Sequence, residues 1–183
     1  EPQLPPLSER LDSFREIACR FGEDCVIWRF DPLLLANTLS ADQTYDRFRR
    51  LLTALQGATD LCVTSFVQMY AKVQRRFERL RQAHGIEVYD PALDAKRALL
   101  ARLADAARGA GISLVVCCQD ELVGGGVLKA GCVDAARLAR VAGATLPDVP
   151  RRGTRPQCGC CASRDIGTYN TCTHRCAYCY ATT

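Results

Sequence analysis

Apolar residues recur at helical spacing in several separate stretches of the chain. These stretches cover residues 8–21, 41–56, 72–84, 91–107 and 133–141. A glycine follows each of the first four closely, which is typical of a helix C-terminus. The pattern therefore predicts five helices, with Ser8 and Glu9 opening the first at its N-cap.

Short runs that are apolar at nearly every position lie between these helices. They cover residues 25–30, 61–66 and 112–118. Continuous apolar runs of this length are typical of strands buried on both faces, as in parallel sheets. Since they alternate with long helices, the sequence predicts an α/β fold built from βα units. The three or four strands visible in this way are enough for an open sheet and too few for a closed barrel.

The last part of the chain has a different character. Residues 145–157 are rich in Pro and Arg and show no periodicity, so they are expected to form a connecting loop. The tail beyond them is dominated by cysteines and turn-forming residues. We therefore expect a βα domain over residues 1–150 and a Cys-rich tail over residues 151–183.

Each predicted strand turns polar as it ends. The residues concerned are Arg29 and Asp31, then Thr64, Ser65 and Gln68, then Cys117, Cys118, Gln119 and Asp120. Ordinary loop polarity would also give this pattern. In parallel α/β folds, however, ligand groups collect at the carboxyl ends of strands. The functional interpretation predicts one pocket lined by Arg29, Asp31, Ser65, Gln119 and Asp120.

Composition and charge narrow the class of protein. A hydrophobic share of 48% is too high for a disordered chain. The net charge of +4 is mildly basic, and the arginines are spread along predicted helices. Solvated helix faces explain this distribution, and a phosphate-binding surface for nucleic acid is the alternative. No apolar run approaches the roughly 20 residues of a membrane span, and the N-terminus does not have the pattern of a signal peptide.

The chain holds 12 cysteines, and half of them lie after residue 157. Such clustering, without a secretion signal, favours a metal site in a reducing cytoplasm over a secreted disulfide scaffold. The scattered Cys19, Cys25 and Cys62 are expected to be small buried hydrophobes.

Cys172, Cys176 and Cys179 have the spacing C-x3-C-x2-C. Three thiolates at this spacing can hold a [4Fe–4S] cluster and leave its fourth iron open to a small chelating molecule. Radical S-adenosylmethionine enzymes use this spacing, with S-adenosylmethionine on the open iron and an aromatic residue where Tyr178 stands. Zinc is the alternative, since Cys176 and Cys179 form one knuckle that His174 or the pair Cys158 and Cys160 could complete.

Several motifs resemble the bacterial family called domain of unknown function 1848. They are VIWRFDP at 26–32, TSFV at 64–67, GCVD at 131–134 and the tail over 158–181. The resemblance implies a distant relation to spore photoproduct lyase and other radical S-adenosylmethionine proteins. It also implies that the chain is a C-terminal fragment whose strands form a partial, incomplete TIM-like barrel.

The resemblance further implies a role for Cys118, Cys132, Cys158 and Cys160, which match recurring cysteines of that family. Four thiolates could hold a second iron–sulfur cluster or zinc. Unconnected buried thiols are the alternative, and Cys117 and Cys161 are not required by the family pattern.

Two functions stay open. One is a radical S-adenosylmethionine enzyme of unknown substrate, and the other is a non-catalytic metal-binding module. Either is compatible with a nucleic-acid partner.

Overall fold

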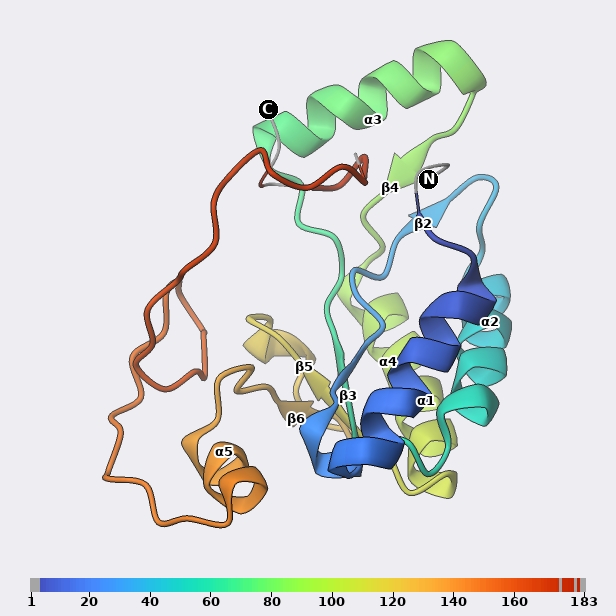
Figure 1. Cartoon of the computed structure of the whole chain (residues 1–183). Coiled ribbons are helices and arrows are strands. Elements are labelled where there is room, and N and C mark those ends of the chain that lie inside the picture. Colours follow the sequence, from blue (N-terminus) through green and yellow to red (C-terminus); the bar gives the residue numbers. More distant parts are fainter. Residues whose placement is uncertain (1–3, 175, 180, 182–183) are drawn as a thin grey trace.

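A four-stranded parallel sheet forms the centre of the protein. The computed structural model describes residues 4–174, 176–179 and 181, and Figure 1 shows the sheet amid its helices. The strands stand in the order β1-β3-β5-β6. They are β1 (Trp28–Arg29), β3 (Leu61–Thr64), β5 (Ser113–Val116) and β6 (Leu128–Lys129). Every neighbouring pair is parallel, which confirms the prediction of a parallel α/β sheet.

All five predicted helices are present, with ends within about two residues of those expected. They are α1 (Leu7–Phe21), α2 (Ala41–Leu55), α3 (Ala71–His84), α4 (Leu93–Gly109) and α5 (Ala135–Ala142). Two short 3₁₀ turns, η1 (Glu23–Cys25) and η2 (Asp120–Leu122), follow α1 and β5. A small antiparallel pair, β2 (Leu35–Ala36) with β4 (Val88–Tyr89), lies apart from the main sheet.

The structure differs from the sequence prediction at two places near the N-terminus. The helix α1 begins at Leu7, with Pro6 at the N-cap and no side-chain cap, so the prediction that Ser8 caps this helix is wrong. The apolar run 25–30 forms a strand only at Trp28–Arg29, which pair with Cys62 and Val63 of β3, and its first residue belongs to η1. The strands β2, β4 and β6 were not predicted, since two residues are too few to show a periodicity.

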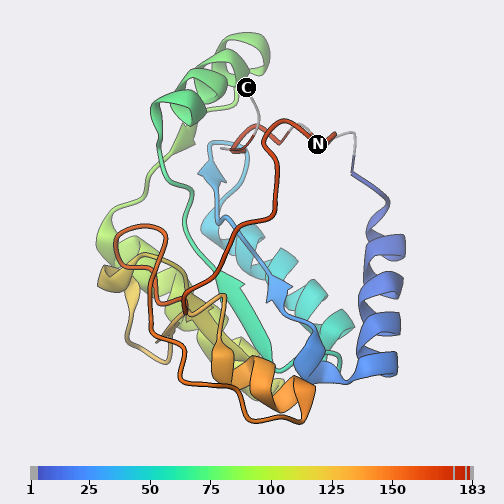
Figure 2. The same cartoon turned by 60° about the vertical axis from the view of Figure 1, so that its left-hand side comes forward.

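The two faces of the sheet are covered differently. Cys62, Leu114 and Val116 belong to the main hydrophobic core together with residues of α2 and α4. Val63 and Val115, which alternate with them, face a smaller cluster that contains several cysteines. Figure 2 shows α2 and α4 behind the sheet and the C-terminal segment, coloured orange to red, in front of it. The cysteine-rich segment therefore covers the face that the long helices leave open.

Neighbouring strands in the sheet follow one another along the chain, apart from the separate β2 and β4. This order is found in the walls of βα barrels, but the sheet among the described residues stays open between β1 and β6. The partial TIM-like barrel therefore stays a prediction, as does the division into residues 1–150 and 151–183. In the part of the chain that the structure describes, no helix is both long and apolar enough to cross a membrane.

Candidate functional site

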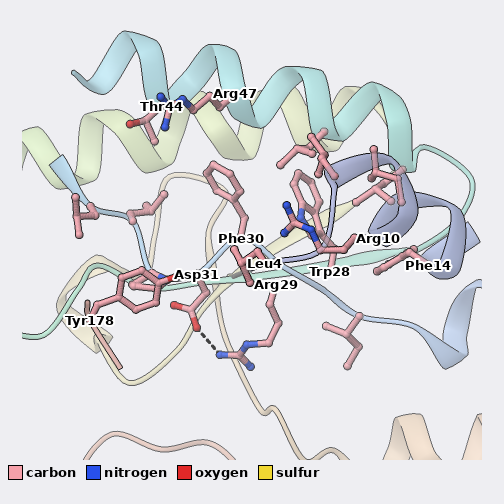
Figure 3. Close-up of a pocket in the computed structure, with 18 of the residues that line it drawn as sticks. Leu4, Arg10, Phe14, Trp28, Arg29, Phe30, Asp31, Thr44, Arg47 and Tyr178 are labelled. Atoms are coloured by element: carbon pink, nitrogen blue, oxygen red, sulfur yellow. Dashed lines mark hydrogen bonds and ion pairs between the residues drawn. The ribbon is translucent and has the colours of Figure 1, made fainter. Parts of the chain in front are cut away.

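A cavity of about 580 Å³ runs along β1, between α1 and α2, and extends past the carboxyl end of the strand. Its polar lining comes from α1, β1 and its following loop, α2, and the C-terminal tail, and includes Arg10, Arg29, Asp31, Thr44, Arg47 and Tyr178. In Figure 3, Tyr178 lies beside Asp31 at one end of the cavity, and Thr44 and Arg47 reach it from α2. Three of the predicted site residues, Arg29, Asp31 and Tyr178, thus line one cavity. Tyr178 lies about 150 positions further along the chain than the other two.

Asp31 is the centre of a small polar network at the rim of this cavity. Its Oδ2 accepts a hydrogen bond from Nη2 of Arg29 at 2.6 Å, the contact dashed in Figure 3. Its Oδ1 accepts a hydrogen bond from the Ser65 hydroxyl, which comes from the end of β3. The structure therefore brings the expected residues of two strand ends into contact. Arg29 also donates from Nη1 to the Sγ atom of Cys132, at 3.4 Å.

The predicted residues at the third strand end have other partners. The buried side chain of Gln119 binds the backbone of Phe66, with the Phe66 N–H donating to Oε1 at 2.7 Å. Asp120 pairs with Lys129 of β6 at 2.7 Å. Both contacts fasten loops at the strand ends, and neither residue is among those that line the cavity. A ligand-binding role for Asp120 stays a prediction.

The tail cysteines lie beside α3. Residues 176–179 form a turn in which the Cys179 N–H donates to the Cys176 carbonyl at 3.0 Å. Arg76 of α3 donates to the carbonyl of Cys179 at 2.7 Å and to that of Cys176 at 3.4 Å. Ala177 and Tyr178 pack against Val73 and Phe77 of the same helix, while Cys172 is exposed. The structure therefore holds the C-x2-C pair of the predicted cluster motif next to the cavity, which Tyr178 lines. Figures 1 and 2 show the C-terminal tail running beside α3.

A second group of cysteines lies at the carboxyl ends of β5 and β6. We call Cys117, Cys118, Cys132, Cys158 and Cys160 the thiol cluster. The Sγ atom of Cys117 lies 3.6 Å from that of Cys118 and 3.6 Å from that of Cys132. The Cys158 side chain contacts those of Cys118 and Cys160. The four cysteines expected from the family resemblance are therefore neighbours, and Cys117 stands among them.

Close backbone approaches make this gathering possible. A Cβ atom at Gly159 would lie 2.5 Å from the carbonyl oxygen of Ala130, and one at Gly131 would lie 3.0 Å from that of Gly159. Only glycine allows the loop that carries Cys158 and Cys160 to lie this close to the strand that leads to Cys132. Cys118 itself has a left-handed backbone with φ of 53°, which is uncommon for a residue other than glycine. These backbone conformations therefore bring the cysteine side chains together.

Gly159→Ala is expected to destabilise the protein by about 1–3 kcal/mol, because the added methyl group meets a backbone oxygen that cannot turn away. Gly109→Ala is the matched control, since a Cβ atom at this helix end meets nothing within 4 Å. Urea denaturation of both variants checks the expectation. Equal denaturation midpoints for the two variants would show that Gly159 is not packed tightly against the backbone of Ala130.

Arg155, from the predicted connecting loop, places its guanidinium group against the thiol cluster. Its Nε donates to Sγ of Cys118 at 3.0 Å and its Nη2 to Sγ of Cys117 at 3.6 Å. A hydrogen bond from Cys132, together with Arg155, lowers the pKa of the Cys117 thiol to about 5 despite its burial. Burial raises the pKa of Cys118 to about 11, and the backbone N–H of Cys160 lowers that of Cys158 to about 7. The cluster therefore holds one readily ionised thiolate beside a permanent cation.

Sequence reasoning did not single out Arg155 or include Cys117 in a site. Arg155 lies in an unpatterned stretch with several other arginines, so no sequence signal distinguishes it. The position of Cys117 next to Cys118 was a signal that it could belong to the same site. However, consecutive residues of a regular strand point to opposite faces, so the two side chains were not expected to meet. The left-handed conformation of Cys118, which brings the two side chains together, is not visible in a sequence.

Neither group of cysteines, as far as the structure describes it, is arranged as a metal site. Among residues 4–174, 176–179 and 181, no three or more His, Cys, Asp or Glu side chains form a group that could hold a metal ion as they stand. The predicted ligands Cys172, Cys176 and Cys179, and the predicted second set, therefore stay predictions.

Fold and site together define a cysteine-rich α/β protein, with an open parallel sheet whose strand ends meet a cavity and a cluster of thiols. The chain belongs to the family described as "Domain of unknown function (DUF1848)", which matches residues 1–181. This confirms the family resemblance found in the sequence. No curated protein and no solved structure matches the chain.

Proposed function

We propose that the protein is an iron–sulfur protein of the radical S-adenosylmethionine type, acting on an unknown substrate. Cys172, Cys176 and Cys179 would hold a [4Fe–4S] cluster, and the cavity would receive S-adenosylmethionine. The observation that supports this best is that Tyr178, inside the cysteine motif, lines the same cavity as Arg29 and Asp31. A cluster on this loop would therefore lie near the pocket at the strand ends. When bound, such a cluster supplies one electron that cleaves the sulfonium bond of S-adenosylmethionine.

The donor set and the cavity suit these two groups. Three cysteines leave one iron without a protein ligand, as the binding of a chelating cofactor requires. S-adenosylmethionine carries a carboxylate, an amine and a sulfonium, so it needs both cationic and anionic partners. Arg10, Arg29 and Arg47 offer the first and Asp31 the second. Apolar residues such as Phe14 and Trp28 offer a surface for the adenosine part. The strands around this pocket would be part of a TIM-like barrel.

Anaerobic reconstitution with iron and sulfide tests the proposal. The wild-type chain is expected to bind about four irons at the tail motif, and Cys176→Ala is expected to lose them. Cys19 and Cys25 are exposed, so the prediction that they are buried is wrong, and it holds for Cys62 alone of the three. The exposed Cys19 on α1 therefore offers a matched control, and Cys19→Ala is expected to keep the wild-type iron content. The proposal fails if Cys176→Ala retains all the iron and sulfide of the wild type.

The cavity is tested separately. Adding S-adenosylmethionine should change the electron paramagnetic resonance spectrum of the reduced cluster in the wild-type chain. Asp31→Ala should bind iron normally but require about tenfold or more S-adenosylmethionine for the same change, because it removes a charge-assisted contact. A spectrum that S-adenosylmethionine never alters would exclude the cofactor while leaving an iron–sulfur protein.

A non-catalytic metal-binding module is the second candidate function. The gathering of five cysteines in the thiol cluster favours it, since metal–thiolate sites often stabilise small folds. In that case zinc or an iron–sulfur cluster would fasten the tail to the sheet, and a partner such as nucleic acid would bind elsewhere. A colourless protein that binds zinc tightly and takes up no iron and sulfide would support this candidate over the first.

A further inference from the structure

The loop over residues 164–171 presents two large apolar side chains to solvent. Ile166 is 94% exposed and Tyr169, three positions further on, is 63% exposed. Every residue of this loop is exposed. Figure 1 shows the tail, coloured orange to red, at the outer edge of the molecule as it approaches α3. Apolar side chains gathered on an exposed surface are a common mark of an interaction site.

Hydrogen bonds fix the shape of this loop and tie it to the predicted cluster motif. The N–H of Gly167 donates to Oδ1 of Asp165 at 2.8 Å. Asn170 has a left-handed backbone, with φ of 64°, and its N–H donates to the carbonyl of Ala181 at 2.9 Å. Cys172, the first of the three predicted cluster ligands, follows two positions later and is exposed. A protein that docks on the loop therefore approaches the cluster motif from the solvent side.

The surface around the loop is basic. Residues 151–174 contain four arginines and one acidic residue, Asp165. An antiparallel bridge pairs Arg151 with Cys161, which brings the stretch 150–152 beside the chain that leads into the loop. Arg152 in that stretch and Arg164 at the start of the loop are both exposed. A partner that complements this surface carries acidic side chains around a small apolar centre.

Two other occupants fit this surface less well. A stable dimer buries about 1,200 Å² or more in total, which two apolar side chains and a few arginines do not provide. A nucleic acid is bound through many phosphate contacts, often about six to ten. The stretch offers four arginines, and Arg155 among them is bound to the thiol cluster. Electron-transfer proteins, by contrast, meet their partners through small and short-lived interfaces.

We propose that the loop over residues 164–171 is the docking site for an acidic one-electron carrier protein. This inference rests on the proposed function, since a cluster that supplies one electron must receive another before it can act again. Ile166 and Tyr169 form the apolar centre of the interface, and Arg152 and Arg164 form its charged rim. One electron passes from the reduced carrier to the oxidised cluster, so the carrier is oxidised and the cluster is reduced. No covalent bond forms or breaks in this step.

Binding to the full-length chain without iron tests the docking surface by itself. The probe is isotope-labelled flavodoxin, an acidic one-electron carrier. Its nuclear magnetic resonance signals are expected to shift when the wild-type chain is added at low salt, and to return when added salt screens the charges. The double variant Ile166→Ser with Tyr169→Ser, and separately Arg164→Glu, are expected to weaken binding at least about tenfold, the loss typical of central interface side chains.

Two exposed positions on other helices serve as matched controls. Phe21→Ser on α1 removes an exposed apolar side chain and Arg50→Glu on α2 reverses an exposed charge, so both variants should bind flavodoxin as the wild type does. Flavodoxin signals that stay unmoved with the wild-type chain, or that move equally with every variant, would overturn the proposal. It also fails if a labelled single-stranded DNA binds through Ile166 and Tyr169 in place of flavodoxin, or if a dimer of the chain buries these residues.

Reduction kinetics separate this docking site from the proposed function. In the chain reconstituted with iron and sulfide, the loop variants should receive electrons from reduced flavodoxin at least about tenfold more slowly than the wild type. Dithionite, a small reductant that needs no docking surface, should reduce all of them at the wild-type rate. Equal rates with flavodoxin would refute the docking site and leave the proposed function intact. A chain that binds flavodoxin through the loop but takes up no iron and sulfide would refute the proposed function and support the docking surface alone.

Discussion

Replacing Phe48 by alanine is expected to lower the free energy of unfolding by about 3–5 kcal/mol, the range for deleting a large buried aromatic side chain. Phe48 lies on α2 and is 0% exposed. Its ring stacks on Trp28 at 4.8 Å between centroids and meets the edge of Phe30 at 5.2 Å. Trp28 and Phe30 flank Arg29 on either side along the chain. Removing the Phe48 ring therefore leaves a void next to the cavity.

Phe21→Ala is the matched control for this change. Phe21 ends α1 and is 67% exposed, so its loss should change stability by no more than about 0.5 kcal/mol. Chemical denaturation followed by circular dichroism measures both variants. A loss below about 1 kcal/mol for Phe48→Ala would mean that the aromatic group is not packed as described.

Arg137→Ala is expected to cost about 2–3 kcal/mol. Arg137 lies on α5, where its side chain is 8% exposed and its Nη2 is 2.6 Å from Oδ1 of Asp60. Its Nε donates to the carbonyl of Asp24 at 2.8 Å. Breaking a fully buried pair costs about 3–5 kcal/mol, but the Asp60 side chain is 36% exposed, so water recovers part of this loss.

Arg108→Ala provides the comparison for an exposed ion pair. Arg108 pairs with Asp105 at 2.9 Å, with both side chains more than half exposed. Pairs of this kind contribute about 0–1 kcal/mol, so the midpoint of urea denaturation should hardly move. If the two arginine variants unfold at the same urea concentration, Arg137 does not hold α5 to the sheet.

The helices of this protein could be predicted from the sequence because their signal is long and local. In α2, for example, buried Phe48, Leu52 and Leu55 recur at helical spacing, and Ser40 and Gln43 close a capping box. The strands gave a weaker signal. The four-residue strands β3 and β5 were predicted, but β6 was not, because pairing with β5 rather than any pattern of its own defines it.

The residues of the cavity were predictable in part for a related reason. Parallel strands end at the same edge of a sheet, so Asp31 and Ser65 were expected to be neighbours, and they are in contact. The same reasoning included Gln119 and Asp120. Gln119 instead binds the backbone of Phe66, a long-range partner that no local pattern reveals.

By itself, the sequence determined the parallel α/β class, the helices and the family, because hydrophobic period and motif spacing are properties of neighbouring residues. It also showed that the chain is rich in cysteines concentrated toward its end. Only the tertiary structure decided which thiols meet. Cys117 meets Cys132, and Cys118 meets Cys158, where Cys118 has a left-handed backbone and Gly159 lies against Ala130. Such contacts join segments far apart in the chain, and folding alone brings them together.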